Sequence, residues 1–194
     1  MSLFNLFKKI TKKQPEKHTE NTKEIDMDQI NKMMRYRQMP EWYEDYLMHE
    51  AIAEQNKYVD DRKSQKHFNI AYELAKDSIL TKHFLLIKLI DYYYGLREMQ
   101  KDALETCISY CKESIELTPK VLKQMEYQHD EIYERDYEFV PPSMPAFKRL
   151  AIIYENQQKY DEVIKICEKA LELGLRDGTK SGFEGRIERL KKKI

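Results

Sequence analysis

The chain has 194 residues, and its 34 lysines and arginines are balanced by 34 aspartates and glutamates. It therefore has no overall positive charge of the kind that draws a protein to nucleic acid. Only 5 glycines and 6 prolines occur, while 35% of the residues are charged, a composition typical of a protein built from helices. An all-β fold and a glycine-rich nucleotide-binding fold are disfavoured.

The N-terminal residues 1–24 are predicted to form a flexible arm that is basic and amphipathic. A helical wheel places five apolar side chains within about 160° and four lysines on the remaining arc. The apolar set is Leu3, Phe4, Leu6, Phe7 and Ile10. Residues 1–13 are therefore candidates for weak contact with a membrane surface or for insertion into a partner, and a plain disordered tail is the alternative.

Three later segments share one spacing of small residues. They begin at Ala71, Cys107 and Val163, and each places small residues at i, i+4 and i+7, followed by an apolar residue at i+8. This spacing defines one face of a helix. The first two segments are 36 residues apart (107 − 71) and the next two 56 (163 − 107). The excess predicts an insert at about residues 119–144.

The predicted insert is bounded by prolines and is strongly acidic. Thr118 followed by Pro119 is typical of a helix start, because threonine is a favoured cap and proline fits the first helical position. Residues 126–138 carry six acidic side chains against Arg135 alone. The pattern predicts an acidic connector, with no role that the sequence defines.

Each small-residue helix is preceded by another segment of apolar periodicity, at residues 42–58, 83–96 and 145–156. Recurring helix pairs predict at least six antiparallel helices between Glu41 and Leu173. Gly174 follows as a helix stop, and the pattern from Ser181 to Glu184 is a capping box. A final helix is therefore predicted to begin near Gly182 and to cover the end of the array.

The third helix pair resembles the tetratricopeptide repeat. The matching positions are Phe147, Leu150, Ala151, Tyr154 and Ala170, whereas Val163 and Cys167 depart from the usual alanine and aromatic residue. The resemblance implies an all-α domain at residues 41–194, in which helix pairs stack as a right-handed superhelix. It would hold about three degenerate repeats and a C-terminal capping helix.

The resemblance also implies a concave groove lined by the first helix of each pair. The groove positions would be Asn56, Lys88, Tyr92, Lys148, Ile152 and Asn156. The two lysines would meet a carboxylate of a peptide, and Tyr92 and Ile152 would supply apolar contact. The alternative for Tyr92 is packing against the acidic insert. Tyr92 and Ile152 stand where the family's clamp for a terminal carboxylate uses asparagine, so that specificity is not implied.

Motifs for catalysis or for metal binding are incomplete. The zinc-protease pattern that begins at His49 has Ala53 where the second histidine belongs. Cys107 and Cys111 share a helix face, yet no further pair is spaced to complete a tetrahedral zinc site, so we expect both to pack in the core. The stretch His129-Asp130-Glu131 is predicted to be a solvated acidic surface. The sequence thus predicts no enzyme and no cofactor.

The favoured function is a non-catalytic protein- or peptide-binding module in the cytoplasm. Three cysteines with no disulfide pattern favour a reducing compartment, the apolar stretches are too short to span a membrane, and neither a cleavable signal nor a myristoylation site is present. The alternative is a peripheral membrane-associated assembly factor anchored by residues 1–13. Nucleic-acid binding is disfavoured, because the basic stretches at 8–13 and 186–193 lack interleaved aromatic residues.

Overall fold

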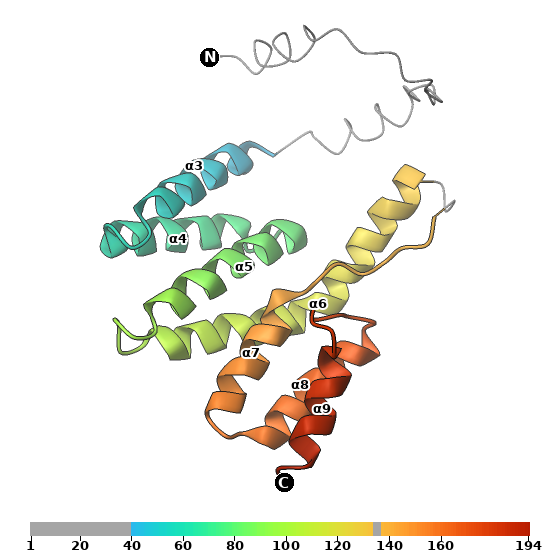
Figure 1. Cartoon of the computed structure of the whole chain (residues 1–194). Coiled ribbons are helices and arrows are strands. Elements are labelled where there is room, and N and C mark those ends of the chain that lie inside the picture. Colours follow the sequence, from blue (N-terminus) through green and yellow to red (C-terminus); the bar gives the residue numbers. More distant parts are fainter. Residues whose placement is uncertain (1–39, 134–136) are drawn as a thin grey trace, which may run out of the picture.

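The computed structural model describes residues 40–133 and 137–194, and these residues form seven α-helices and no β-strand (Figure 1). The helices are α3 (Glu41–Asn56), α4 (Asp61–Ala75), α5 (Ile79–Leu96), α6 (Ala103–Tyr133), α7 (Pro145–Asn156), α8 (Tyr160–Glu172) and α9 (Gly182–Lys191). The predicted all-α class is confirmed for this part of the chain. None of these helices is long and apolar enough to cross a bilayer. The predicted arm at 1–24 lies outside the described residues.

Consecutive helices pack in pairs: α3 against α4, α5 against α6, and α7 against α8. Successive pairs are also in contact, through α4 with α5, α6 with α7, and α5 with α7. The six helices expected between Glu41 and Leu173 are therefore present as α3 to α8, and α9 packs on α8 at the C-terminal end (Figure 1).

The row of small residues lies where the second helix of each pair meets its neighbours. Six of its members are fully buried: Ala71, Ala75, Cys107, Cys111, Val163 and Cys167. Small side chains at i and i+4 allow two helices to approach closely, which explains why this spacing recurs.

The correspondence between the three segments ends after i+4. Ser78 is the N-cap of α5, and its hydroxyl accepts a hydrogen bond from the Thr81 amide at 3.4 Å. Ser114 and Ala170, at the matching positions, remain inside α6 and α8. The prediction that α5 begins at His83 is therefore wrong by four residues, because a serine cap starts the helix at Ile79.

Helix α6 is the main departure from the predicted architecture, because it passes through Pro119 and continues to Tyr133. The Thr118 hydroxyl donates to the Ser114 carbonyl at 2.8 Å within the same helix, so it does not cap a new one. Proline removes one backbone hydrogen bond from a helix interior, but Thr118 and Val121 are fully buried on either side of it. Tertiary packing thus keeps the helix continuous, and residues 119–133 are helix rather than connector.

The core consists of two groups of buried side chains. The group around α3, α4 and α5 includes Tyr46, Phe68, Leu89 and Tyr92. The group around α6 to α9 includes Phe147, Leu150, Val163, Phe183 and Leu190. Each buried side chain of this size contributes about 1.5–3 kcal/mol relative to exposure. The C-terminal helix α9 is thus part of the core.

The start of α9 is capped differently from the predicted box. Ser181 occupies the N-cap position, but its side chain makes no capping hydrogen bond. The Gly182 amide instead donates to the Thr179 hydroxyl at 3.2 Å. Glu155 on α7 holds the helix further along, through Arg186 at 2.7 Å and Arg189 at 2.8 Å.

Candidate binding surfaces

The residues predicted to line a groove do not come together in one site. The side-chain amide of Asn56 donates to the Ile52 carbonyl at 2.7 Å, one turn back in its own helix. Lys88 forms an ion pair with Glu50, which joins α5 to α3. Lys148 donates to the Asp177 carbonyl at 3.1 Å. The two lysines that were expected to hold a peptide carboxylate already contact groups of this chain.

Tyr92 is a core residue, which contradicts its predicted place on a groove surface. Its side chain is fully buried, and its hydroxyl donates to the Asp61 carboxylate at 2.9 Å. The ring lies 5.3 Å from Phe68 and 5.7 Å from Tyr58, between centroids. The predicted alternative, packing on the acidic insert, is also wrong, since these partners belong to α4 and the loop before it. Burial raises the pKa of Tyr92, so the hydroxyl stays protonated and remains a donor.

The last two predicted positions lie on α7. Ile152 is half-buried, and Asn156 is exposed. Asn156 borders a cavity of about 250 Å³ that also involves Tyr94 and Arg97 of the α5 end. This cavity contains none of the other five predicted groove residues. Two guanidinium groups pack against the Tyr94 ring beside this cavity: Arg97 lies 4.1 Å and Arg149 3.9 Å from the ring centroid.

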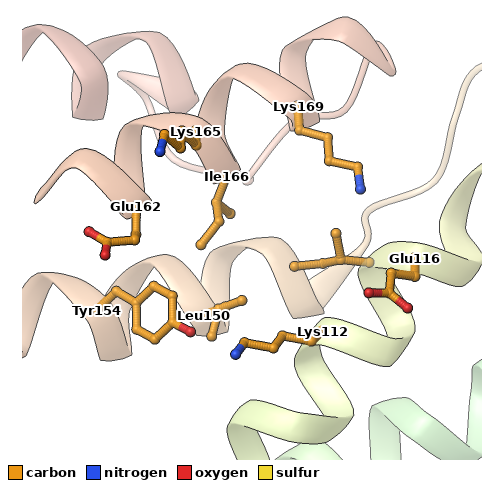
Figure 2. A pocket seen from close by; sticks show the side chains of 9 residues that line it. Lys112, Glu116, Leu150, Tyr154, Glu162, Lys165, Ile166 and Lys169 are labelled. Carbon is orange, nitrogen blue, oxygen red and sulfur yellow. The ribbon is translucent and has the colours of Figure 1, made fainter. Parts of the chain in front are cut away.

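A second cavity, of about 400 Å³, lies between α6, α7 and α8 (Figure 2). Its floor is apolar and comes from all three helices: Ile115, Leu150, Tyr154 and Ile166. Its rim is charged and exposed: Lys112, Glu116, Glu162, Lys165 and Lys169. An apolar floor within a polar rim is the usual anatomy of a surface that binds another molecule. We call this feature the lysine-rimmed cavity.

The three lysines of the lysine-rimmed cavity have no ion-pair partner among the described residues, and the same holds for its two glutamates. Figure 2 shows Lys165 and Lys169 on α8 across the apolar floor from Lys112 on α6. Because the lysine charges flank apolar surface without being neutralised, the cavity suits a ligand that combines carboxylates with an apolar group.

Helical spacing explains how the sequence builds this cavity. On α8 the lining residues Glu162, Lys165, Ile166 and Lys169 follow the spacing i, i+3, i+4 and i+7, which places them on one face. Sequence reasoning missed them because α8 was examined only for its small-residue face. An isoleucine among charged residues on the adjacent face of the helix was the available indication.

The three cysteines are fully buried, as the sequence analysis expected. The Cys107 thiol donates to the Ile90 carbonyl at 3.5 Å. The hydrogen bond with Cys107, and then burial, raises the pKa of Cys111. Burial raises the pKa of Cys167 to about 11. The raised pKa values make the thiols of Cys111 and Cys167 poor nucleophiles at neutral pH, because the thiolate is the reactive form.

Two histidines meet between α3 and α4. The Nδ1 atoms of His49 and His67 are 2.7 Å apart, a distance that requires one nitrogen to carry a proton and the other to accept it. Burial lowers the pKa of His67, followed in size by the charges of His49, Lys66 and Lys63. Within residues 40–133 and 137–194, no three histidine, cysteine or acidic side chains are grouped so that they could hold a metal ion.

Comparison with known proteins found no match: no family model, no curated protein and no solved structure matches this chain.

Proposed function

We propose that this chain is a protein- or peptide-binding module, built as a tetratricopeptide-like array of helix pairs. The single observation that carries the proposal is the lysine-rimmed cavity. It joins an apolar floor from three helices to three lysines that have no ion-pair partner in the described part of the chain. Buried apolar contact supplies affinity, and unpaired charge at the rim supplies orientation and selectivity.

The arrangement of helices supports the array. The pairs α3–α4, α5–α6 and α7–α8 pack in chain order, and α5 also contacts α7, the first helix of the next pair. Stacking of this kind exposes an extended surface that crosses several repeats, which suits an extended or helical peptide. The cavity lies at a junction between successive pairs, because α6 belongs to one pair and α7 and α8 to the next.

The binding position differs from the one that the family resemblance implies. Lys88 and Lys148 already contact Glu50 and Asp177, and Tyr92 is buried. A ligand that used those lysines would have to displace contacts within the chain, whereas the rim lysines would lose only water. The lysine-rimmed cavity is therefore the better candidate.

Selection from a displayed peptide library on the immobilised full chain tests this function. Peptides enriched on the wild type are then titrated by calorimetry against the variant Lys165→Glu/Lys169→Glu. We expect binding to weaken by at least about tenfold, because like charges across an interface repel. The matched control is Lys101→Glu/Lys180→Glu, which makes the same charge change at exposed positions away from the cavity.

Two results would contradict the proposal. Failure of the wild type to enrich any peptide argues against peptide binding. Equal weakening by the cavity variant and by the control variant shows that net charge alone, and not the cavity, governs the interaction. A third variant, Lys88→Glu/Lys148→Glu, tests the originally predicted groove in the same titration.

A further inference from the structure

The C-terminal part of α6 stands apart from the helices on either side of it (Figure 1). Among the described residues, this end of the helix and the segment from residue 137 onward present three exposed tyrosines and three exposed glutamates. They are Glu126, Tyr127, Glu131, Tyr133, Tyr137 and Glu138. We call this set the acidic tip. The tyrosine side chains are 41–60% exposed, which is unusual for rings of this size and marks a surface that can bind a partner.

Within the described part of the chain, the three glutamates of the acidic tip have no basic side chain as an ion-pair partner. The Tyr127 hydroxyl donates to Glu131, one turn further along α6, which orients the ring and the carboxylate together. The tip residues up to Tyr133 thus present carboxylates beside aromatic rings on a helix, and Tyr137 and Glu138 follow beyond the end of α6.

The acidic tip and the lysine-rimmed cavity are complementary in charge and in chemistry. The rim of the cavity carries three lysines against two glutamates, an excess of positive charge around an apolar floor, and the tip offers three carboxylates beside tyrosine rings. Tyrosine is enriched at the centres of protein interfaces, because its ring buries apolar area while its hydroxyl keeps a hydrogen bond. We propose that the acidic tip of one copy docks into the lysine-rimmed cavity of a second copy; this rests on the proposed function, of which it names the partner.

The two surfaces cannot meet within one copy. Lys112 at the cavity and Glu126 at the tip lie on the same continuous helix α6, and 14 residues of helix separate their Cα atoms by about 21 Å. A rigid helix cannot fold back on itself to close that distance. The tip must therefore act on another molecule.

This geometry predicts how copies associate. Tip and cavity are different surfaces, so the contact is heterologous, and an open assembly keeps one free tip and one free cavity at its ends until a ring closes. The assembly is expected to grow with protein concentration rather than stop at a symmetric dimer. Raising the salt concentration should weaken it, because the rim charges are exposed and screened.

Sedimentation velocity of the full chain tests the proposal from about 1 µM to about 1 mM, a range that covers weak self-association. Three double variants are compared with wild type. The cavity variant is Lys165→Glu/Lys169→Glu, the tip variant is Glu126→Lys/Glu131→Lys, and the control is Lys101→Glu/Lys180→Glu. We expect wild type and control to associate alike, and each of the other two variants alone to associate at least about tenfold more weakly.

Mixing the cavity variant with the tip variant gives the decisive result. In the mixture, the acidic tip of the cavity variant can bind the lysine rim of the tip variant. The second possible contact, between the lysine-bearing tip and the glutamate-bearing cavity, also joins opposite charges. Association should therefore return in the mixture, although each variant alone associates much more weakly than wild type. Circular dichroism of each variant checks that the helices are intact, so that loss of folding is not mistaken for loss of contact.

Three outcomes would overturn the inference: a wild-type chain that stays monomeric at the highest concentration, association that is equal in all variants, or a mixture that stays as monomeric as its parts. None of them removes the proposed function. A monomeric chain that still binds library peptides through the cavity would keep the binding module and discard the second copy as its ligand.

Discussion

Replacing Tyr92 by alanine distinguishes a core residue from a residue that lines a binding surface. The ring is fully buried on α5, it packs against Phe68 at 5.3 Å and Tyr93 at 5.2 Å between centroids, and its hydroxyl donates to Asp61 at 2.9 Å. The contacts with Phe68 and Asp61 join α5 to α4. We therefore expect Tyr92→Ala to destabilise the fold.

The expected magnitude follows from burial and hydrogen bonding. Removing a fully buried aromatic ring costs about 3–5 kcal/mol in transfer and cavity terms. For a helical chain of this size, each kcal/mol shifts the melting temperature by about 2–4 °C, so we expect a fall of roughly 10 °C. Tyr92→Phe removes only the hydroxyl. It should cost about 1 kcal/mol, because Asp61 also accepts hydrogen bonds from the Tyr58 amide at 3.2 Å and from Gln100 at 3.4 Å.

Urea unfolding followed by circular dichroism measures these differences. The matched control is Phe84→Ala, which removes an aromatic ring from the same helix at a position that is 51% exposed. We expect the control to lie within about 1 kcal/mol of wild type, because surface substitutions rarely cost more. The unfolding slope should be unchanged in all variants if they expose the same area.

The reasoning would be refuted if Tyr92→Ala matched Phe84→Ala in stability. Unchanged stability together with weaker peptide binding would show that the ring is accessible to a ligand and would return Tyr92 to a groove. A loss in Tyr92→Phe as large as in Tyr92→Ala would instead mean that the Asp61 hydrogen bond, and not the packing, holds the two helices together.

Three further predictions concern other parts of the core and its surface. Cys111→Glu should lower the free energy of unfolding by about 3–5 kcal/mol, because it buries an unpaired charge. A melting temperature equal to that of Ser109→Glu, a control at an exposed position of the same helix, would contradict the burial of Cys111. Lys88→Glu should lower the free energy of unfolding by about 1 kcal/mol, and the charge swap Glu50→Lys/Lys88→Glu should restore that stability. A double-mutant cycle that shows no coupling energy between the two positions would refute the ion pair. The lowered pKa of His67 means that the unfolded chain binds a proton more readily than the folded chain, so the free energy of unfolding should fall as pH drops through the ordinary value of 6.5. In urea unfolding, the stability of His67→Gln should depend less steeply on pH than that of wild type. An equal pH dependence in both proteins would refute the role of His67.

The part of the fold that the sequence predicted well is the part governed by local spacing. Small residues at i and i+4 mark the helices that pack closely, in the segments that start at Ala71, Cys107 and Val163. The residues at these two positions are buried in all three segments. Their spacing depends only on the helix period, which any sequence reveals. The helix at Gly182 was predictable for the same reason, from apolar residues on one face.

Helix α6 could not be predicted from local rules. Thr118 and Pro119 are a favoured start for a helix in isolation. In the fold, Thr118 and Val121 are buried, and their packing outweighs the one backbone hydrogen bond that proline removes. Local propensity is worth little against burial of several side chains, so the sequence placed a boundary where the structure has none. The continuous helix carries the acidic residues at its C-terminal end away from the other helices (Figure 1), and the proposed self-association depends on this placement.

The residues of the candidate site could not be predicted from local sequence either. A residue's position on its own helix fixes the direction of the side chain but not what lies in that direction. Tyr92 was expected to project into a groove, yet it points at Asp61, 31 residues earlier in the chain. Lys165 and Lys169 attracted no prediction, because exposed lysines on a helix are ordinary. Only the approach of α6 and α7 places Ile115 and Leu150 beside them and turns a charged helix face into the rim of a cavity. Apolar surface that becomes continuous across three helices is a property of tertiary packing, which is why the candidate binding surface follows from the fold and not from any single helix pair.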